Sequence, residues 1–262
     1  MPEGHLLHRF AHELEQRLAG HLVGASSPQG RFADGAAAID GSALLNAEAH
    51  GKHLFARFEV VPPAVVHIHL GRQGLWFWGP TSSAPRSSVR LRLAAAQQAA
   101  DVIAPLVCEL TDEARRDAVV TGLGPDPIRD DADTDAALGA IRASGHAIGA
   151  LLLDQSVIAG VGNVLRAELL NMTGIHPAIE GQRLDETLLD NLWQTSVTVM
   201  RQAEREGRII TRRPSDTAVE TVDEVEGRFV YGRERCGRCG TALEHLKIAG
   251  RAINACPVCQ PH

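Results

Sequence analysis

Four cysteines near the end of the chain have the spacing of a metal site. They form two CxxC pairs, Cys236 with Cys239 and Cys256 with Cys259, and 16 residues separate the pairs. This spacing is typical of one structural zinc ion (Zn2+), for which each pair supplies two thiolates and a hairpin joins the pairs. Two disulfides are the alternative. We favour zinc because we expect no signal peptide on this chain, and therefore a reducing compartment, the cytoplasm.

The second residue of the chain is a candidate covalent catalyst. Removal of Met1, which is efficient before a small residue, would make Pro2 the mature N-terminus, with the Glu3 carboxylate beside its secondary amine. A terminal amine titrates near 8, so roughly a tenth of it is free base at pH 7, far more than an unperturbed lysine provides. Such an amine can attack a sugar carbon. Taken alone this signal is weak, because many proteins begin with Met-Pro.

A glycine-framed turn in the second half of the chain has features of a phosphate site. Gly160 and Gly162 bracket one valine, and Asn163 is predicted to cap the helix that follows. Glycines permit tight turns with exposed N–H groups, and a helix start carries partial positive charge. Together they could hold a DNA phosphate. A plain capped corner between two helices is the alternative that the turn leaves open.

Composition argues against a protein that coats nucleic acid through its overall charge. The chain has 262 residues, 44% of them hydrophobic, and a net charge of −6. This length suggests two domains plus a small module. Residues 227–262 carry six Lys or Arg against two acids, so the cysteine-rich end is suited to face phosphate. An ordinary solvated ribbon is the alternative. The chain has no long apolar segment, and we expect no membrane association.

The first half of the chain is predicted to position Pro2 and Glu3 through one helix and a β-structure. Apolar residues at helical spacing predict a helix over residues 3–19. Short apolar runs between turn-forming residues then predict a sandwich or barrel, with strands over residues 37–45, 52–60, 65–70, 75–78, 89–93 and 101–107. We assign Trp76, Phe77, Trp78 and Cys108 to its core, and we interpret His67 and His69 as packing residues.

The second half is predicted to be helical before the cysteine module. The expected helices cover residues 135–143, 147–153, 164–172 and 184–202, and residues 205–226 are interpreted as a mobile loop. The fold class is therefore α+β with several domains. The predicted division is a β-sandwich domain over 2–121, an exposed linker over 122–134, a helical domain over 135–226 and a zinc finger over 227–262.

Five motifs resemble the formamidopyrimidine-DNA glycosylase/endonuclease VIII family of base-excision repair enzymes. The likeness is greatest to the endonuclease VIII-like proteins of actinobacteria. The motifs span the whole chain in the expected order: PEGH at 2–5, GKHLF at 51–55, HLG at 69–71, LLDQSVIAGVGN at 152–163 and GRAINACPVCQ at 250–260. The resemblance implies an N-terminal helix with a β-sandwich, a helix–two-turn–helix domain and a zinc-finger hairpin, with damaged DNA bound between the two halves of a monomer.

The resemblance also implies a role for each matching residue. Pro2 matches the nucleophile, Glu3 the proton-transfer residue and Lys52 the active-site lysine. Gly162 and Asn163 match the turn that holds phosphate. Arg251 matches the arginine at the tip of the zinc-finger hairpin, beside the phosphates around the lesion. Zinc would be held by Cys236, Cys239, Cys256 and Cys259.

The implied reaction joins glycosylase and abasic-site lyase chemistry. Attack of the Pro2 nitrogen at C1′ would expel the damaged base and leave a cationic iminium. The iminium acidifies the C2′ proton, so that β,δ-elimination removes both flanking phosphates. The target base must leave the duplex, and Arg72 and Gln73 would lie at the vacated space. For Arg72, stacking there and contacting phosphate remain equally open.

Several departures from the family pattern favour oxidised pyrimidines over oxidised purines. Purine-directed members carry Met at the position of Arg72 and an Arg-Phe pair in the segment matching residues 101–105, and this chain has neither. A preference for abasic sites, or for single-stranded or bubble DNA, stays open. Two other readings are a non-catalytic zinc ribbon that binds DNA or a repair partner, and a zinc-ribbon protein acting on RNA. The intact Pro2, Glu3 and Lys52 favour the enzyme.

Overall fold

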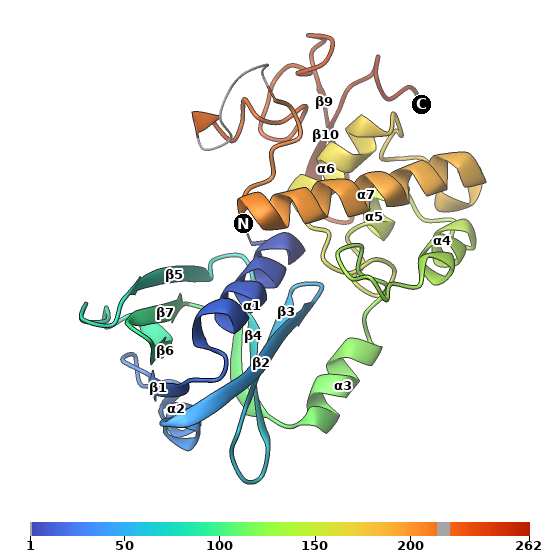
Figure 1. Cartoon of the computed structure of the whole chain (residues 1–262). Coiled ribbons are helices and arrows are strands. Elements are labelled where there is room, and N and C mark those ends of the chain that lie inside the picture. Colours follow the sequence, from blue (N-terminus) through green and yellow to red (C-terminus); the bar gives the residue numbers. More distant parts are fainter. Residues whose placement is uncertain (1, 214–220) are drawn as a thin grey trace. The chain divides into compact units, whose positions relative to one another are not determined.

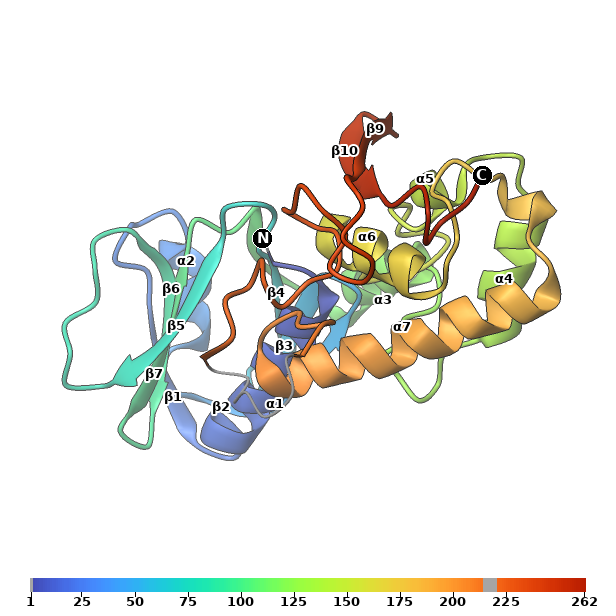
Figure 2. The same cartoon turned by 90° about the horizontal axis from the view of Figure 1, so that it is seen from above.

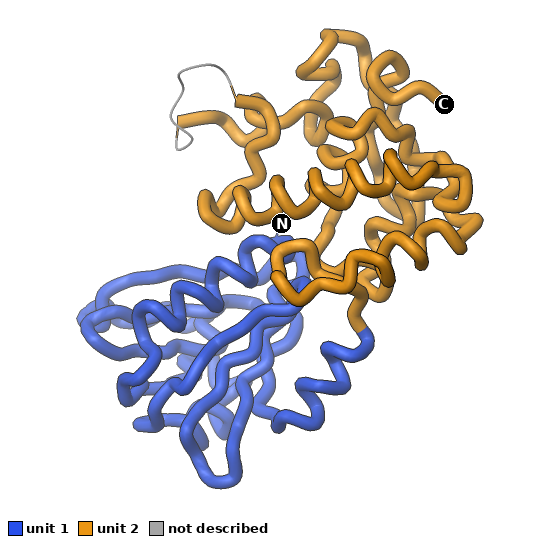
Figure 3. Tube along the Cα trace, turned by 45° about the vertical axis from the view of Figure 1, so that its right-hand side comes forward, with its two compact units in different colours: residues 1–122 blue, residues 123–262 orange. Residues whose placement is uncertain are grey.

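The computed structural model describes residues 2–213 and 221–262, which form two compact units (Figure 3). The first unit comprises residues 1–122 and the second comprises residues 123–262. The segment 214–220, which belongs to the predicted mobile loop, lies outside the described residues.

The first unit is a β-sandwich in which all neighbouring strands are antiparallel. Its strand order is β5-β7-β6-β1-β2-β3-β4-β8. Strand β1 pairs with β6 on one side and with β2 on the other, so it links the half β5-β7-β6-β1 to the half β2-β3-β4-β8. The strands are β1 (Leu22–Ser26), β2 (Ser42–His50), β3 (His53–Phe58), β4 (Ala64–His69), β5 (Leu75–Pro80), β6 (Val89–Ala95), β7 (Gln98–Ile103) and β8 (Val107–Thr111).

Helix α1 (Gly4–Leu18) packs against β2 and β3 and fixes the start of the chain (Figure 1). It buries Leu7, Ala11, Leu14 and Leu18, which recur every three or four residues and therefore share one face. Gly20 follows the helix with φ of +76°, a conformation that glycine adopts without steric cost. The helix predicted over residues 3–19 is confirmed.

Three sequence predictions in the first unit need correction. The predicted strand over 37–45 is wrong in its first part, because helix α2 (Ala33–Ile39) precedes β2. The predicted strand over 101–107 is two strands, β7 and β8, separated by a turn at Ala104 with φ of +46°. Phe77 is 43% exposed on the edge strand β5 and does not belong to the core, whereas Trp76 is buried. Strand β1 and helix α3 (Glu113–Thr121) were not predicted.

The second unit is helical and ends in a two-stranded hairpin. Its elements are α4 (Thr134–Arg142), α5 (Ile148–Leu151), α6 (Asn163–Met172), the 3₁₀ turn η1 (Gly181–Arg183), α7 (Glu186–Glu206), β9 (Glu244–Ile248) and β10 (Arg251–Ala255). The helices predicted over 135–143, 164–172 and 184–202 are confirmed, and that over 147–153 is the single turn α5. Strand β10 contacts α6, and Figure 2 shows the hairpin beside that helix. One apolar core contains helix residues together with Val230, Leu243 and Ile253 of the cysteine module.

The segment 122–134 is not the exposed linker that the sequence predicted. Asp126, Pro127 and Ile128 are buried, and Ile128 belongs to the helical core. Gly124 packs so closely on the backbone of Val157 that a Cβ at this position would lie 2.5 Å from its carbonyl carbon. Among the helices described, none combines the length and the apolar character needed to cross a bilayer.

Candidate functional site

The candidate catalytic residues of the N-terminus lie at the start of α1. Glu3 is the N-cap residue of this helix and is only 1% exposed, and Pro2 beside it is half-buried. The Glu3 carbonyl accepts a hydrogen bond of 3.0 Å from the N–H of Leu6. A carboxylate at this position interacts favourably with the partial positive charge of a helix start. The packing of α1 therefore holds a carboxylate directly beside Pro2.

Lys52 lies at the turn between β2 and β3. His50 and His53 form the last pair of the hairpin, and Gly51 takes φ of +56° in the turn. Lys52 is half-buried. Burial lowers the pKa of both His53 and His69, and the positive charge of Lys52 adds to this effect at each ring. The lysine is therefore near both imidazole rings.

Arg72 and Gln73 are exposed in the turn between β4 and β5. Gly71 begins this turn with φ of +65°, and its N–H donates a hydrogen bond of 2.9 Å to Nδ1 of His69. A Cβ at Gly71 would lie 2.8 Å from the Cβ of Leu106, a side chain that is 72% exposed. The close approach of the β7–β8 connection helps to explain why glycine occupies this position.

Sequence reasoning missed a chain of side chains between these two turns. Nδ1 of His53 lies 2.9 Å from Nε2 of His67, and Nδ1 of His67 lies 2.9 Å from Oε1 of Glu109. The ring centroids of His53 and His69 lie 4.7 Å apart. Burial, followed by the charges of His69, His67 and Lys52, lowers the pKa of His53 to about 3. These residues come from β3, β4 and β8, and only strand register brings them together.

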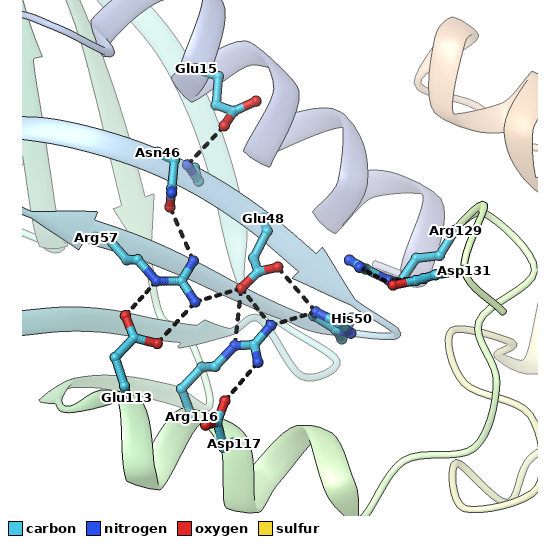
Figure 4. A network of polar contacts seen from close by, with 11 residues as sticks. Glu15, Asn46, Glu48, His50, Arg57, Glu113, Arg116, Asp117, Arg129 and Asp131 are labelled. Carbon is cyan, nitrogen blue, oxygen red and sulfur yellow. Dashed lines mark hydrogen bonds and ion pairs between the residues drawn. The ribbon is translucent and has the colours of Figure 1, made fainter.

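A charged network anchors α3 to the β2–β3 hairpin (Figure 4). Oε1 of Glu48 lies 2.8 Å from Arg57 and 2.6 Å from Arg116, and Oε2 lies 3.2 Å from Nε2 of His50. Arg57 also pairs with Glu113 at the start of α3. Burial opposes ionisation of Glu48, but the contacts with His50 and Arg57 and the charge of Arg116 hold its pKa well below its usual range. Through His50, the last residue of β2, the network reaches the β2–β3 turn that contains Lys52.

The glycine-framed turn before α6 is held by its own side chains. Gln155 donates from Nε2 to the carbonyl of Val161 at 3.0 Å and accepts at Oε1 from the N–H of Gly160, also at 3.0 Å. The Gly160 N–H therefore has its hydrogen-bond partner within the turn itself. Asn163 is not the helix cap that the sequence predicted. The cap is Gly162, and Asn163 is the first residue of α6.

A buried arginine connects this helix start to the hairpin that carries Arg251. Arg166 has no exposed surface, and its Nη2 donates to Oδ1 of Asn163 at 2.5 Å and to the carbonyl of Ala252 at 3.0 Å. Its Nη1 donates to the carbonyl of Gly149 at 3.0 Å. Asn163 also donates from Nδ2 to the Ala252 carbonyl at 3.2 Å. Arg251 is exposed and directly precedes Ala252, so the structure brings Asn163 close to the residue beside Arg251.

The four cysteines lie together in the geometry of a metal site. Their Sγ atoms lie within 4.8 Å of one another, with Cys236 3.9 Å from Cys259 and Cys239 3.4 Å from Cys256. A tetrahedral ion with sulfur ligands at 2.3 Å would give sulfur separations of about 3.8 Å. These contacts far exceed a disulfide bond of about 2.05 Å. The N–H groups of Arg238 and Cys259 donate to the sulfurs of Cys236 and Cys256, which favours thiolates. The site fits one four-coordinate metal ion.

Comparison with known proteins gives matches along the whole chain. Residues 1–103 match the formamidopyrimidine-DNA glycosylase N-terminal domain, and residues 123–215 match the formamidopyrimidine-DNA glycosylase H2TH domain. Endonuclease 8 1 of Mycobacterium tuberculosis is 43% identical, covering 99% of this chain and 100% of the relative. Probable endonuclease 8 2 of Streptomyces coelicolor is 30% identical, covering 99% of this chain and 94% of the relative.

A solved structure of a DNA glycosylase also matches over almost the whole chain. The complex between Lactococcus lactis Fpg and DNA containing an abasic site matches with a TM-score of 0.79 and 26% identity, covering 99% of this chain and 100% of that chain. The fold class, the catalytic class of DNA N-glycosylase with abasic-site lyase activity and the actinobacterial resemblance are thereby confirmed. The chain belongs to the formamidopyrimidine-DNA glycosylase/endonuclease VIII family of DNA repair enzymes.

Proposed function

We propose that this enzyme removes oxidised bases from DNA, with pyrimidines favoured, and cuts the strand by β,δ-elimination through a Schiff base at Pro2. The observation that carries this proposal is the buried Glu3 carboxylate directly beside Pro2 at a firmly packed helix start. A proton-transfer group needs a fixed position relative to the nucleophile, and α1 supplies it.

The Pro2 nitrogen has the chemistry for both steps. Once Met1 is removed, its lone pair attacks C1′ of the damaged nucleotide and the base leaves with a proton. The nitrogen lone pair then forms a C1′=N double bond as the C1′–O4′ bond breaks and O4′ takes a proton, which gives an iminium cation with no N–H proton to lose. The cation withdraws electrons from C2′, so that a proton leaves C2′ and the 3′ phosphate is expelled, followed by the 5′ phosphate. Glu3 moves protons in these steps.

The remaining predicted residues bind and stabilise the DNA. Lys52 neutralises negative charge on phosphate or sugar oxygens as the strand is cut. Arg251, exposed at the start of β10, contacts phosphates around the lesion. Gly162 and Asn163 hold another phosphate at the start of α6, where the helix dipole favours an anion. Arg72 and Gln73 enter or border the space that the flipped base leaves.

The metal ion proposed for the cysteine site is zinc, and its role is structural. Cys236, Cys239, Cys256 and Cys259 fill a four-coordinate shell, which leaves no position for water or substrate. Bound zinc supplies folding stability to residues 227–262 and keeps β9 and β10 in register. A thiolate site of this kind is suited to a reducing compartment, so we place the enzyme in the bacterial cytoplasm. As a separate part of the proposal, the enzyme acts on DNA as a monomer.

The substrate preference rests on Arg72, on residues 101–105 and on the relatives. Several relatives are named endonuclease 8, and the ones from M. tuberculosis and S. coelicolor each cover 99% of this chain. A panel of oxidised pyrimidines, oxidised guanine, hydantoins and abasic sites, in duplex and bubble DNA, measures the preference. We expect the highest single-turnover rate among base lesions for an oxidised pyrimidine. A faster rate on oxidised guanine would contradict this.

Borohydride trapping tests the Pro2 mechanism. Borohydride reduces an iminium to a stable amine, so the wild-type enzyme and abasic DNA should give a covalent adduct that maps to the Pro2 peptide. Pro2→Gly should lose most of the adduct, while Pro85→Gly, at an exposed proline of the same unit, should retain it. Absence of a wild-type adduct, or products that stop at β-elimination, would overturn the mechanism.

A further inference from the structure

Two turns that carry DNA-binding candidates are connected by histidines. Lys52 lies at the β2–β3 turn and Arg72 lies at the β4–β5 turn. His53 directly follows Lys52, and His69 hydrogen-bonds the N–H of Gly71 beside Arg72. The two imidazole rings meet edge to face, with centroids 4.7 Å apart and an interplanar angle of 67°. A displacement of the His53 ring would therefore change the positions of residues in both the β2–β3 turn and the β4–β5 turn.

The His53 ring is in turn oriented by a hydrogen-bonded chain that ends on a carboxylate. An ionised Glu109 can only accept, so the contact of 2.9 Å requires that His67 donates from Nδ1. With both rings neutral, Nε2 of His67 then accepts from Nδ1–H of His53 across 2.9 Å. This order fixes the tautomer of each ring. Nε2 of His53 remains as a hydrogen-bond acceptor at the end of the chain.

The middle of the chain is held rigidly by the sandwich. His67 is 3% exposed, and its ring stacks on that of Phe55, which is fully buried, with centroids 4.7 Å apart. The register pairs Phe55 with His67 and His67 with Glu109, so three adjacent strands place the three side chains in one row. Glu109 lies at the accessible end, with 43% of its side chain exposed.

We propose that Glu109, His67 and His53 form a positioning relay that holds the Lys52 turn, and through His69 the Arg72 turn, in the geometry needed for strand cleavage. The three are positioning residues, since they act through Lys52 and the Gly71–Gln73 turn. The proposal rests on the proposed function in one respect, the role of Lys52 in cleavage. Orientation rather than binding is affected, so a broken relay lowers the rate of the chemical step more than it weakens DNA affinity.

Matched substitutions at His53 separate a hydrogen-bonding role from simple packing. Asn can place an N–H near the position of Nδ1, whereas Leu fills similar space without a donor. A relay predicts that His53→Asn cuts abasic DNA faster than His53→Leu, and packing alone predicts the reverse. Glu109→Leu tests the far end of the chain at a partly exposed position, and Glu59→Leu, at an exposed carboxylate after β3, is its control.

Single-turnover cleavage with saturating enzyme, DNA affinity and thermal stability are measured for each variant. We expect His53→Leu and Glu109→Leu to lose roughly tenfold or more in cleavage rate, the scale of a displaced catalytic group. Their DNA affinity should change little, and His53→Asn should recover most of the rate. The relay is overturned if His53→Leu cleaves at the wild-type rate, or if the Leu and Asn variants lose activity equally.

A measurement that does not depend on activity keeps this test distinct from that of the proposed function. Nitrogen-15 NMR of the imidazoles reports the tautomer of each ring, and wild type should show protonated Nδ1 at both His53 and His67. Glu109→Leu should shift the His67 resonances, while Glu59→Leu should not. If the wild type gives no borohydride adduct, the proposed function fails. If the NMR spectra instead showed a mixture of tautomers at His53 and His67, the relay would be overturned and the proposed function would stand.

Discussion

At the scale of single residues, buried charged groups decide how the candidate site is held. Glu168 on α6 has no exposed surface and accepts hydrogen bonds from the N–H groups of Phe229, Val230 and Tyr231 at 2.7, 2.9 and 2.7 Å. Thr211 also donates its hydroxyl to the same carboxylate. One side chain thus accepts hydrogen bonds from three successive backbone N–H groups in the segment that leads into the cysteine module.

Removing this carboxylate should destabilise the second unit. Glu168→Ala leaves three backbone N–H groups without their acceptor, a buried one at Val230 and partly buried ones at Phe229 and Tyr231. An unmet buried donor costs about 1–3 kcal/mol. We expect the free energy of unfolding, measured by denaturant titration, to fall by about 3 kcal/mol or more. Glu234→Ala, at a side chain 91% exposed, should change it by less than about 0.5 kcal/mol. Equal stability of the two variants would contradict this role for Glu168.

The residues that sequence could identify are those whose spacing along the chain is itself the signal. The two CxxC pairs, the Pro2-Glu3 start and the motif around Asn163 are local patterns. Glu109, His67 and His53 could not be found in this way, because their contacts depend on the register of β3, β4 and β8. Arg166 likewise gave no signal, since its partners on α5 and β10 are distant in sequence.

At the scale of elements, α3 is attached to the sandwich mainly by charge. The helix buries none of its own residues, and its contacts to the sheet run through Arg116 to Glu48 and through Glu113 to Arg57 (Figure 4). An element held by ion pairs rather than by an apolar face gives a weak hydrophobic pattern. This explains why residues 113–121 were not predicted as a helix. The turn that separates β7 from β8 contains Ala104 and Pro105, and the strand predicted over 101–107 ran across this proline although proline cannot donate to a strand ladder.

The ion-pair network makes part of the stability of the first unit depend on pH. The folded-state pKa of Glu48 is depressed below the ordinary glutamate pKa of 4.5, so its contribution to stability is fully present above pH 4.5 and is lost progressively as the pH falls toward the depressed folded-state pKa. We expect Glu48→Gln to be less stable than wild type at pH 7, with the difference shrinking as the pH falls below 4.5. The melting temperatures of the wild type and of Glu48→Gln, measured from pH 7 to below pH 4.5, give this difference in stability. A difference that stayed constant with pH would assign the effect to packing.

Element boundaries were predicted best where one apolar face is buried. Helix α1 and helix α7 show this face clearly, and both were predicted within a few residues. Helix α2 was read as part of a strand because its short alanine-rich sequence gives no helical period. The 122–134 segment was read as exposed from its Pro and Asp content, although Ile128 enters the core. Composition alone does not show which residues of an irregular segment are buried.

At the scale of the whole molecule, two compact units have separate apolar cores. The core of the second unit includes Cys236 and Cys256, so the metal ligands and the helices share one folded body. The first unit contains no part of this metal site. Loss of the metal should therefore affect the two units unequally.

Metal removal is the test of this arrangement. Structural zinc contributes on the order of 10 kcal/mol to the folding of small zinc modules. We expect a strong chelator to lower the melting temperature of the second unit, to raise hydrogen exchange over residues 227–262 and to weaken DNA binding. Exchange in the first unit, over β2 to β4, should stay unchanged, and added zinc should restore the original pattern. Cys259→Ser should reproduce the chelator effect without chelator. If both units lost protection together on chelation, or if neither did, the cysteine site would not stabilise the second unit in the way its shared core implies.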